Sequence, residues 1–181
     1  LLNGNKLELS PKHLVIAVAE KPLALAGIMG GEHSGVGAGT RDVILESAFF
    51  APEVIAGKTR ELGFGSDSAF RFERGVDFAA TRTAMERATG LILQICGGSA
   101  GPVTEARNQL PERKGVRVRL QRVRQILGFS LDAASAVAIL TRLGFAPKMN
   151  GDVIECVAPS YRFDVAIEED LIEELARVHG Y

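Results

Sequence analysis

Residues 146–158 read APKMNGDVIECVA, and this stretch decides the fold of the second half of the chain. Asn150-Gly151 is the strongest short signal for a tight β-hairpin turn, because both residues tolerate the positive φ that such a turn requires. Strands are therefore predicted on either side, at 146–148 and 152–158. The other predicted elements of this half are, in chain order, a strand at 116–120, a helix at 121–127, a helix at 131–143 and a last helix at 168–178. Two short helices followed by a hairpin is the order of a winged helix, so residues 114–181 are predicted to form a small winged-helix-like domain.

Capping and chain-breaking residues mark the edges of this domain. Ser130 precedes the helix at 131–143 and is predicted to be its N-cap. Upstream, residues 98–115 lack sustained periodicity and carry several glycines and prolines, which is typical of a connection between domains. A linker is predicted near 107–115, and residues 1–107 are predicted to form a separate domain.

The first half combines short strands with helices. Apolar, partly β-branched runs predict buried strands at 14–19, 23–26 and 42–49. Pro52 suits the first turn of a helix that runs to about Leu62. A second helix is predicted to begin near Asp77, a good N-cap, and to end at Gly97-Gly98. A mixed sheet with packed helices assigns the chain to the α+β class.

Composition excludes several kinds of protein. The 181 residues carry a formal net charge of −1, so contact with nucleic acid would need a local basic patch. Cys96 and Cys156 are too far apart in sequence for a zinc-ligand or disulfide framework. No apolar run is long enough to span a bilayer and no signal peptide is visible, so a cytoplasmic location is expected. The chain begins at Leu1, which suggests a segment of a longer polypeptide.

Residues 26–40, AGIMGGEHSGVGAGT, are rich in glycine. They lack the GxGxxG order and precede a predicted strand, so a dinucleotide site is improbable. PEVIAGKT at 52–59 imitates a phosphate loop, but Pro52 stands where that motif needs its first glycine. Gly27, Gly30 and Gly31 either form tight turns alone or let backbone amides approach a ligand.

Glu46 is a single carboxylate in the apolar run VILESAFF. Burying a carboxylate is costly unless it has a polar partner. Two interpretations follow: an edge position or ion pair, with Arg41 or an arginine of RFER at 71–74, or an acceptor in a cavity walled by the glycine loop. Ser66 and Ser68 in the next loop either contact a ligand or act as ordinary loop and cap residues.

Two charge clusters stand out in the second half. Asp170, Glu173 and Glu174 share one face of the predicted last helix, with Asp164 just before it. These carboxylates indicate either an Mg²⁺ site or a solvated acidic face. RKGVRVRLQRVR at 113–124 has six basic residues and no acid, which indicates either a phosphate-binding stripe or a solvated surface strand.

Five motifs together resemble the β subunit of bacterial phenylalanyl-tRNA synthetase. They are LALAGIMGGEHSGV, VILESAFFAPEVI, RFERGVD, ICGGSAGPV and APSYRFDVAIEEDLIEELARVHGY. The resemblance covers nearly the whole chain. It implies that residues 1–107 are the later part of a tRNA-editing domain and that 114–181 are the following winged-helix-like domain. It further implies a ligase of two α and two β subunits that attaches phenylalanine to tRNA(Phe) with ATP and Mg²⁺, the aminoacylation centre lying on the α subunit.

The resemblance also implies roles for single residues. Glu46 would accept the hydroxyl of a tyrosine attached in error, the backbone of Gly27 and Gly30 would shape the pocket, and Ser66 with Ser68 would line it near the ester. No general base is assigned. Mg²⁺, shared with the α subunit, would be bound by four acids: Asp164, Asp170, Glu173 and Glu174. The alternatives are a winged-helix module that binds nucleic acid, or a non-catalytic scaffold that bridges subunits.

Overall fold

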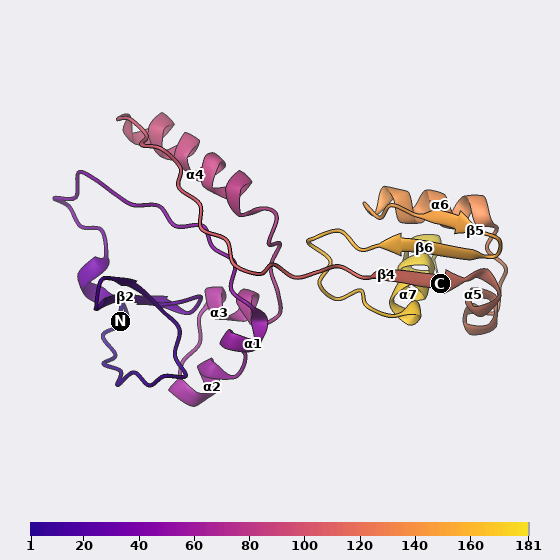
Figure 1. Cartoon of the computed structure of the whole chain (residues 1–181), viewed down its shortest axis with the longest axis horizontal. Coiled ribbons are helices and arrows are strands. Elements are labelled where there is room, and N and C mark those ends of the chain that lie inside the picture. Colours follow the sequence, from indigo (N-terminus) through magenta and orange to yellow (C-terminus); the bar gives the residue numbers. More distant parts are fainter. Residues whose placement is uncertain (181) are drawn as a thin grey trace. The chain divides into compact units, whose positions relative to one another are not determined.

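The computed structural model describes residues 1–180. The chain divides into two compact units, Leu1–Thr104 and the residues from Glu105 onward (Figure 1). Each unit has its own buried apolar cluster and is described by itself. Both combine strands and helices, so the α+β class predicted from the sequence is confirmed.

The first unit is built on a small antiparallel sheet of order β1-β2-β3. β1 (Val15–Val18) and β2 (Lys21–Leu25) form a hairpin, and β3 (Met29–Gly30) returns beside β2. A short 3₁₀ helix, η1 (Glu32–Ser34), follows. The turn between β2 and β3 has Gly27 at φ 67°, in the left-handed region that favours glycine.

Four helices complete this unit. They are α1 (Pro52–Ile55), α2 (Lys58–Leu62), α3 (Asp67–Phe72) and α4 (Thr81–Cys96). The single helix predicted at 52–62 is wrong: Gly57 adopts φ 77° and divides it in two. The predicted N-cap of α4 is also wrong, because Ala80 occupies that position and Asp77 instead accepts a hydrogen bond from the Ala79 amide at 2.9 Å.

The strand predicted at 42–49 does not form. This segment joins neither sheet, and Ile44 is 97% exposed. An apolar run becomes a strand only where a neighbouring strand satisfies its backbone groups. No such neighbour accompanies 42–49 within the described residues.

The second unit contains a three-stranded antiparallel sheet of order β4-β6-β5. β4 (Gly115–Arg119) pairs along its whole length with β6 (Val153–Val157), and β5 (Lys148–Asn150) pairs with the other edge of β6. The hairpin turn at Asn150-Gly151 lies where it was predicted, with Gly151 at φ 60°. β5 begins after Pro147, later than the predicted 146–148, since proline has no N–H to donate to a ladder.

Three helices pack with this sheet: α5 (Leu120–Leu127), α6 (Ala133–Arg142) and α7 (Glu168–His179). The N-cap predicted for α6, Ser130, is wrong by two residues. Asp132, not Ser130, accepts the Ser135 amide at 2.9 Å and the Ser135 hydroxyl at 2.6 Å. Its carboxylate offers two acceptor oxygens, so it satisfies both donors together.

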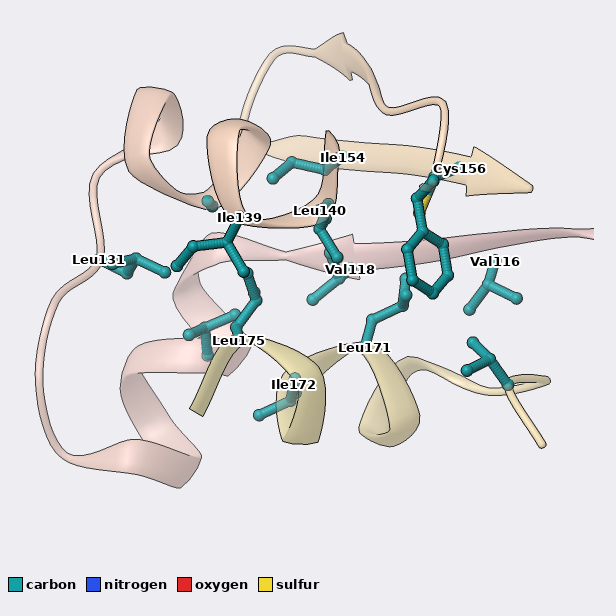
Figure 2. Packing of buried hydrophobic residues seen from close by; sticks show 14 of the residues in the cluster. Val116, Val118, Leu131, Ile139, Leu140, Ile154, Cys156, Leu171, Ile172 and Leu175 are labelled. Atoms are coloured by element: carbon teal, nitrogen blue, oxygen red, sulfur yellow. The ribbon is translucent and has the colours of Figure 1, made fainter. Parts of the chain in front are cut away.

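The core of the second unit lies between the sheet and its helices (Figure 2). Val116, Val118 and Ile154 face inward from the strands, and Leu171 and Leu175 meet them from α7. Burial raises the pKa of the Cys156 thiol to about 11, which keeps this thiol protonated and unreactive at neutral pH. No helix among residues 1–180 is both long enough and apolar enough to cross a membrane.

Candidate functional site

A cavity of about 490 Å³ lies in the first unit, where the β2–β3 turn meets α3 and the segment after residue 45. Most of its wall is apolar side chain or bare backbone, and Glu46 is its one charged residue. The lining residues are Ile16, Ala24, Leu25, Ala26, Gly27, Ile28, Met29, Gly30, Glu46, Ser47, Ala48, Phe50, Ser68 and Phe72. The structure thus brings together four residues that the sequence singled out: Gly27, Gly30, Glu46 and Ser68.

Gly27 must be glycine for two reasons. Its φ of 67° is strained for any other residue. A Cβ atom there would also lie only 3.0 Å from Ile55 Cδ1, 3.1 Å from Phe50 Cδ2 and 3.3 Å from Phe72 Cδ2. Within the described residues the amide of Gly27, a residue of the cavity wall, has no hydrogen-bond partner.

Glu46 lines the cavity but is exposed, which corrects the expectation of a buried carboxylate. The expectation failed because the strand that would have buried it does not form. No ion pair joins Glu46 to Arg41, or to any other basic side chain among residues 1–180. The next residue anchors the segment, since Ser47 Oγ donates to the Thr81 carbonyl oxygen at 2.8 Å. Glu46 is therefore an acceptor held near the cavity without a partner of its own.

Of the two serines that the resemblance places at the pocket, one lines the cavity, and both hydrogen-bond the backbone of the β2–β3 turn. Ser66 Oγ donates to the carbonyl oxygen of Ile28 at 2.6 Å, and Ser68 Oγ donates to that of Gly27 at 2.9 Å. Ser66 is also the N-cap of α3, because its oxygen accepts the Ala69 amide at 3.0 Å. Only Ser68 lines the cavity. Both hydroxyl protons are directed to the backbone.

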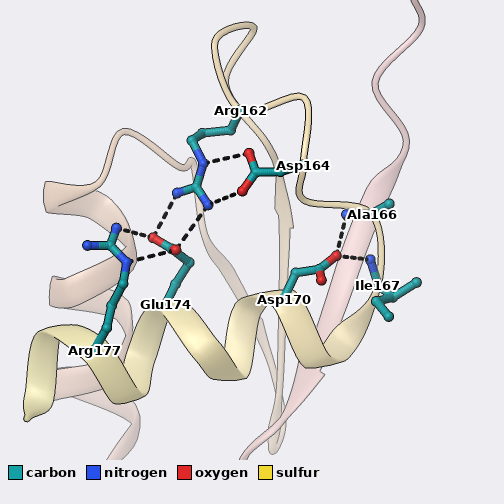
Figure 3. A network of polar contacts seen from close by, with 7 residues as sticks. All are labelled: Arg162, Asp164, Ala166, Ile167, Asp170, Glu174 and Arg177. Carbon is teal, nitrogen blue, oxygen red and sulfur yellow. Dashed lines mark hydrogen bonds and ion pairs between the residues drawn. The ribbon is translucent and has the colours of Figure 1, made fainter. Parts of the chain in front are cut away.

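The acids of the second unit form a network with arginines (Figure 3). Arg162 binds both oxygens of Asp164, with Nε–Oδ1 2.9 Å and Nη2–Oδ2 2.6 Å, and also reaches Glu174, with Nη1–Oε2 2.7 Å. Arg177 binds Glu174 from the other side, with Nε–Oε1 2.8 Å. Glu174 is 4% exposed. The hydrogen bonds from Arg177 and Arg162 lower its pKa to about 2, against the effect of burial.

Four carboxylates were predicted to gather for Mg²⁺, and the fold separates their roles. Asp170 Oδ2 accepts the amides of Ala166 and Ile167 at 2.7 and 2.9 Å, which caps α7. Glu173 is exposed, while Glu174 and Asp164 are occupied by arginine. Across residues 1–180, no three His, Cys, Asp or Glu side chains are placed to hold a metal ion. As this chain folds by itself, these residues do not fit a magnesium site, and metal binding shared with a second subunit stays a prediction.

Three of the six basic residues at 113–124 lie beside acids. Arg117 lies 3.9 Å from Glu155, measured from Nε to Oε1. The Arg119 guanidinium binds Glu168 through two hydrogen bonds, Nε–Oε1 3.0 Å and Nη2–Oε2 2.5 Å, and the Arg119 amide donates to Oε1 at 2.8 Å. Arg122 also has an acidic partner on α7, Glu169. Acids that come later in the chain thus offset part of the charge of the stripe, and phosphate binding by its remaining basic residues stays a prediction.

Sequence reasoning missed Arg162 and Arg177 as the partners of Glu174. A signal was available, because Glu174 falls three residues after Leu171, on the apolar side of α7. An acid in the apolar stripe of a helix needs a cation beside it. Arg177, one turn further along, is the natural first candidate.

Comparison with known proteins assigns a family to each unit. Residues 1–97 match the family model described as B3/4 domain, and residues 116–181 match the tRNA synthetase B5 domain. The chain therefore belongs to the B3/4 domain family.

The most similar relatives carry one name. The chain is 59% identical over 99% of its length to the phenylalanine–tRNA ligase beta subunit of Chromobacterium violaceum. It is 61% identical over its full length to that of Nitrosospira multiformis, and 55% identical to that of Methylococcus capsulatus. It spans 23% of the length of each of these relatives. These matches support the predicted resemblance to a segment of a bacterial phenylalanine–tRNA ligase beta subunit.

Proposed function

We propose that this chain works as part of a phenylalanine–tRNA ligase beta subunit, and that the cavity around Gly27 and Glu46 hydrolyses tyrosine attached in error to tRNA(Phe). The names of the relatives and the B3/4 and B5 matches support the setting. One observation carries the cavity's role: a single unpaired carboxylate stands in a wall that is otherwise uncharged and mostly apolar side chain or bare backbone.

Such a cavity solves a physical problem of the parent reaction. An apolar pocket built for phenylalanine cannot strongly reject an isostere that merely adds a hydroxyl. A second pocket with an acceptor can read that hydroxyl directly. Glu46 would accept a hydrogen bond from the phenol hydroxyl of tyrosine, and phenylalanine would leave the carboxylate without that hydrogen bond.

The chemical step would be hydrolysis of the ester between tyrosine and the terminal ribose. Water adds to the ester carbonyl, the bond to the ribose oxygen breaks, and tyrosine and free tRNA(Phe) leave. Negative charge develops on the carbonyl oxygen in the transition state, where a fixed backbone donor is most effective. The free amide of Gly27 is such a donor in the cavity wall.

Aminoacylation itself would be carried out by the assembled enzyme in this proposal. An α subunit would carry aminoacylation with ATP, tRNA(Phe) would be the shared substrate, and two α and two β chains would form the heterotetramer. The second unit, which matches the B5 domain, would take no part in the chemistry and would contribute through its place in this assembly.

The decisive experiment compares deacylation of Tyr-tRNA(Phe) and Phe-tRNA(Phe) by the full enzyme. Glu46→Gln should slow hydrolysis of Tyr-tRNA(Phe) about tenfold, since the hydrogen bond from the phenol hydroxyl to a charged carboxylate is replaced by a weaker one to a neutral amide oxygen. Glu53→Gln is the matched control, because this exposed glutamate of α1 lies outside the cavity. Equal rates on both substrates in the unmodified enzyme, or an unchanged rate in Glu46→Gln, would refute the proposal.

A further inference from the structure

Ser66 and Ser68 begin α3 with an unusual pair of contacts. Their hydroxyls donate to two consecutive backbone carbonyls, those of Ile28 and Gly27, at 2.6 and 2.9 Å. We infer that these serines are positioning residues: they clamp the Gly27–Ile28 turn against α3 and thereby set the shape of the cavity wall. The inference deepens the proposed editing site and rests on that proposed function for its catalytic consequence.

The hydrogen-bond inventory of a serine favours positioning over substrate contact. A hydroxyl has one proton to donate. In Ser66 and Ser68 that proton is already directed to a carbonyl oxygen, and one lone pair of Ser66 is also taken by the Ala69 amide. Neither hydroxyl can donate to a developing oxyanion without first releasing the turn.

The turn itself shows what the clamp achieves. The Gly27–Ile28 peptide is held at both ends, because the Ile28 amide donates to the Leu25 carbonyl at 3.0 Å while Ser68 binds the Gly27 carbonyl. Ser66 fixes the carbonyl of the following peptide. The preceding amide, that of Gly27, stays without a partner among the described residues. The clamp therefore holds two peptides of a strained glycine turn and keeps one adjacent donor free in the cavity wall.

Amide hydrogen exchange in the 181-residue chain tests the clamp without any substrate. Exchange of the Ile28 amide should be about three- to tenfold faster in Ser68→Ala, the effect of losing one hydrogen bond. Ser68→Thr keeps a hydroxyl and should restore slow exchange. Ser66→Gly should also speed exchange, and it preserves most of the N-cap stability of α3 because glycine is tolerated at that position.

Ser34→Ala is the matched control. Ser34 Oγ also donates to backbone carbonyls of this unit, Leu23 at 2.6 Å and Gly31 at 3.1 Å, but it lies outside the cavity. It should leave both the Ile28 exchange rate and Tyr-tRNA(Phe) hydrolysis unchanged. A general loosening of the sheet would instead make Ser34→Ala and Ser68→Ala behave alike, which would overturn the inference.

Hydrolysis of Tyr-tRNA(Phe) by the full enzyme completes the test. Ser68→Ala should lower kcat about three- to tenfold, matching its effect on exchange, and Ser68→Thr should recover it. A fall in kcat with unchanged Ile28 exchange would make Ser68 a direct substrate contact and overturn the clamp. If the unmodified enzyme hydrolyses no Tyr-tRNA(Phe) while Ser68→Ala still speeds exchange, the proposed function fails and the clamp stands.

Discussion

Gly144→Ala should destabilise the second unit more than its backbone conformation alone explains. Gly144 ends α6 with φ 86°, and a Cβ atom there would overlap the hydroxyl of Tyr161, which donates to the Leu143 carbonyl at 3.0 Å. The left-handed conformation costs alanine about 1–2 kcal/mol. Displacing the tyrosine hydroxyl adds about 1 kcal/mol for the lost hydrogen bond. We expect a total loss of about 2–3 kcal/mol.

The assay is urea unfolding followed by tyrosine fluorescence. The chain has no tryptophan, and its two tyrosines, Tyr161 and Tyr181, both follow residue 105, so the signal reports only the second unit. Gly128→Ala is the control, because Gly128 has φ 77° but open space around its Cα. It should lose only the backbone cost of about 1–2 kcal/mol.

The excess loss in Gly144→Ala should be reduced by a second substitution, Tyr161→Phe, which removes the overlapping oxygen. A double-mutant cycle measures this coupling, expected at about 1 kcal/mol. Because Tyr161→Phe removes a fluorescent tyrosine, unfolding of all four variants of the cycle is followed by far-UV circular dichroism. If Gly144→Ala and Gly128→Ala lose the same stability, Tyr161 does not pack on Gly144 and the reasoning is refuted.

Three further outcomes are expected. Glu174→Gln should cost about 3 kcal/mol at pH 7, the free energy that corresponds to a pKa lowered from 4.5 to about 2, whereas exposed Glu173→Gln should cost little. Because the folded state favours the Glu174 carboxylate, this stabilisation is complete above about pH 4.5 and is lost as pH falls toward 2. The pKa values of Asp164 and Glu168 are also lowered, so acid titration of unfolding should be less steep in Glu174→Gln than in the unmodified chain, and an equal slope in the two would contradict the assignment. Removing divalent cations with EDTA should leave the Tm of the 181-residue chain unchanged, since Arg162 and Arg177 together already neutralise Asp164 and Glu174; a fall of several degrees in differential scanning fluorimetry would indicate a bound metal. Gly27→Ala should lose about 2 kcal/mol or more from the first unit, through its φ and its contact with Ile55; far-UV circular dichroism during unfolding measures this, and a neutral result would show that the turn relaxes.

The second unit could be predicted almost element by element because its information is local. The Asn150-Gly151 turn sets the hairpin, and the apolar periodicity of α6 and α7 finds its partners within about 70 residues. The prediction that failed in this unit is the N-cap of α6, because Ser130 and Asp132 are both residue types that favour this position. Only the backbone conformation before α6 decides which of the two caps the helix.

The first unit was harder to predict because strand formation depends on neighbours that local sequence does not specify. The apolar run at 42–49 has strand composition, yet a strand needs a partner to satisfy its amides and carbonyls. The expected burial of Glu46 depended on that strand and failed with it. The cavity residues nevertheless come together, because the β2–β3 turn and the start of α3 are fixed by Ser66, Ser68 and Gly27.

Glu46 and Glu174 show how a structural acid differs from an acid available to a ligand. Glu174 is buried, bound by two arginines, and has its pKa lowered to about 2 by them, so any ligand must first displace a guanidinium. Glu46 is exposed at a cavity and has no ion-pair partner within the described residues. Glu46 therefore keeps its hydration in the folded chain. A ligand that covers Glu46 removes this water, and a hydrogen bond from a ligand hydroxyl to the carboxylate would offset the free energy of that desolvation. By this criterion the first unit, rather than the acidic helix of the second, presents the carboxylate that is available to hydrogen-bond a ligand.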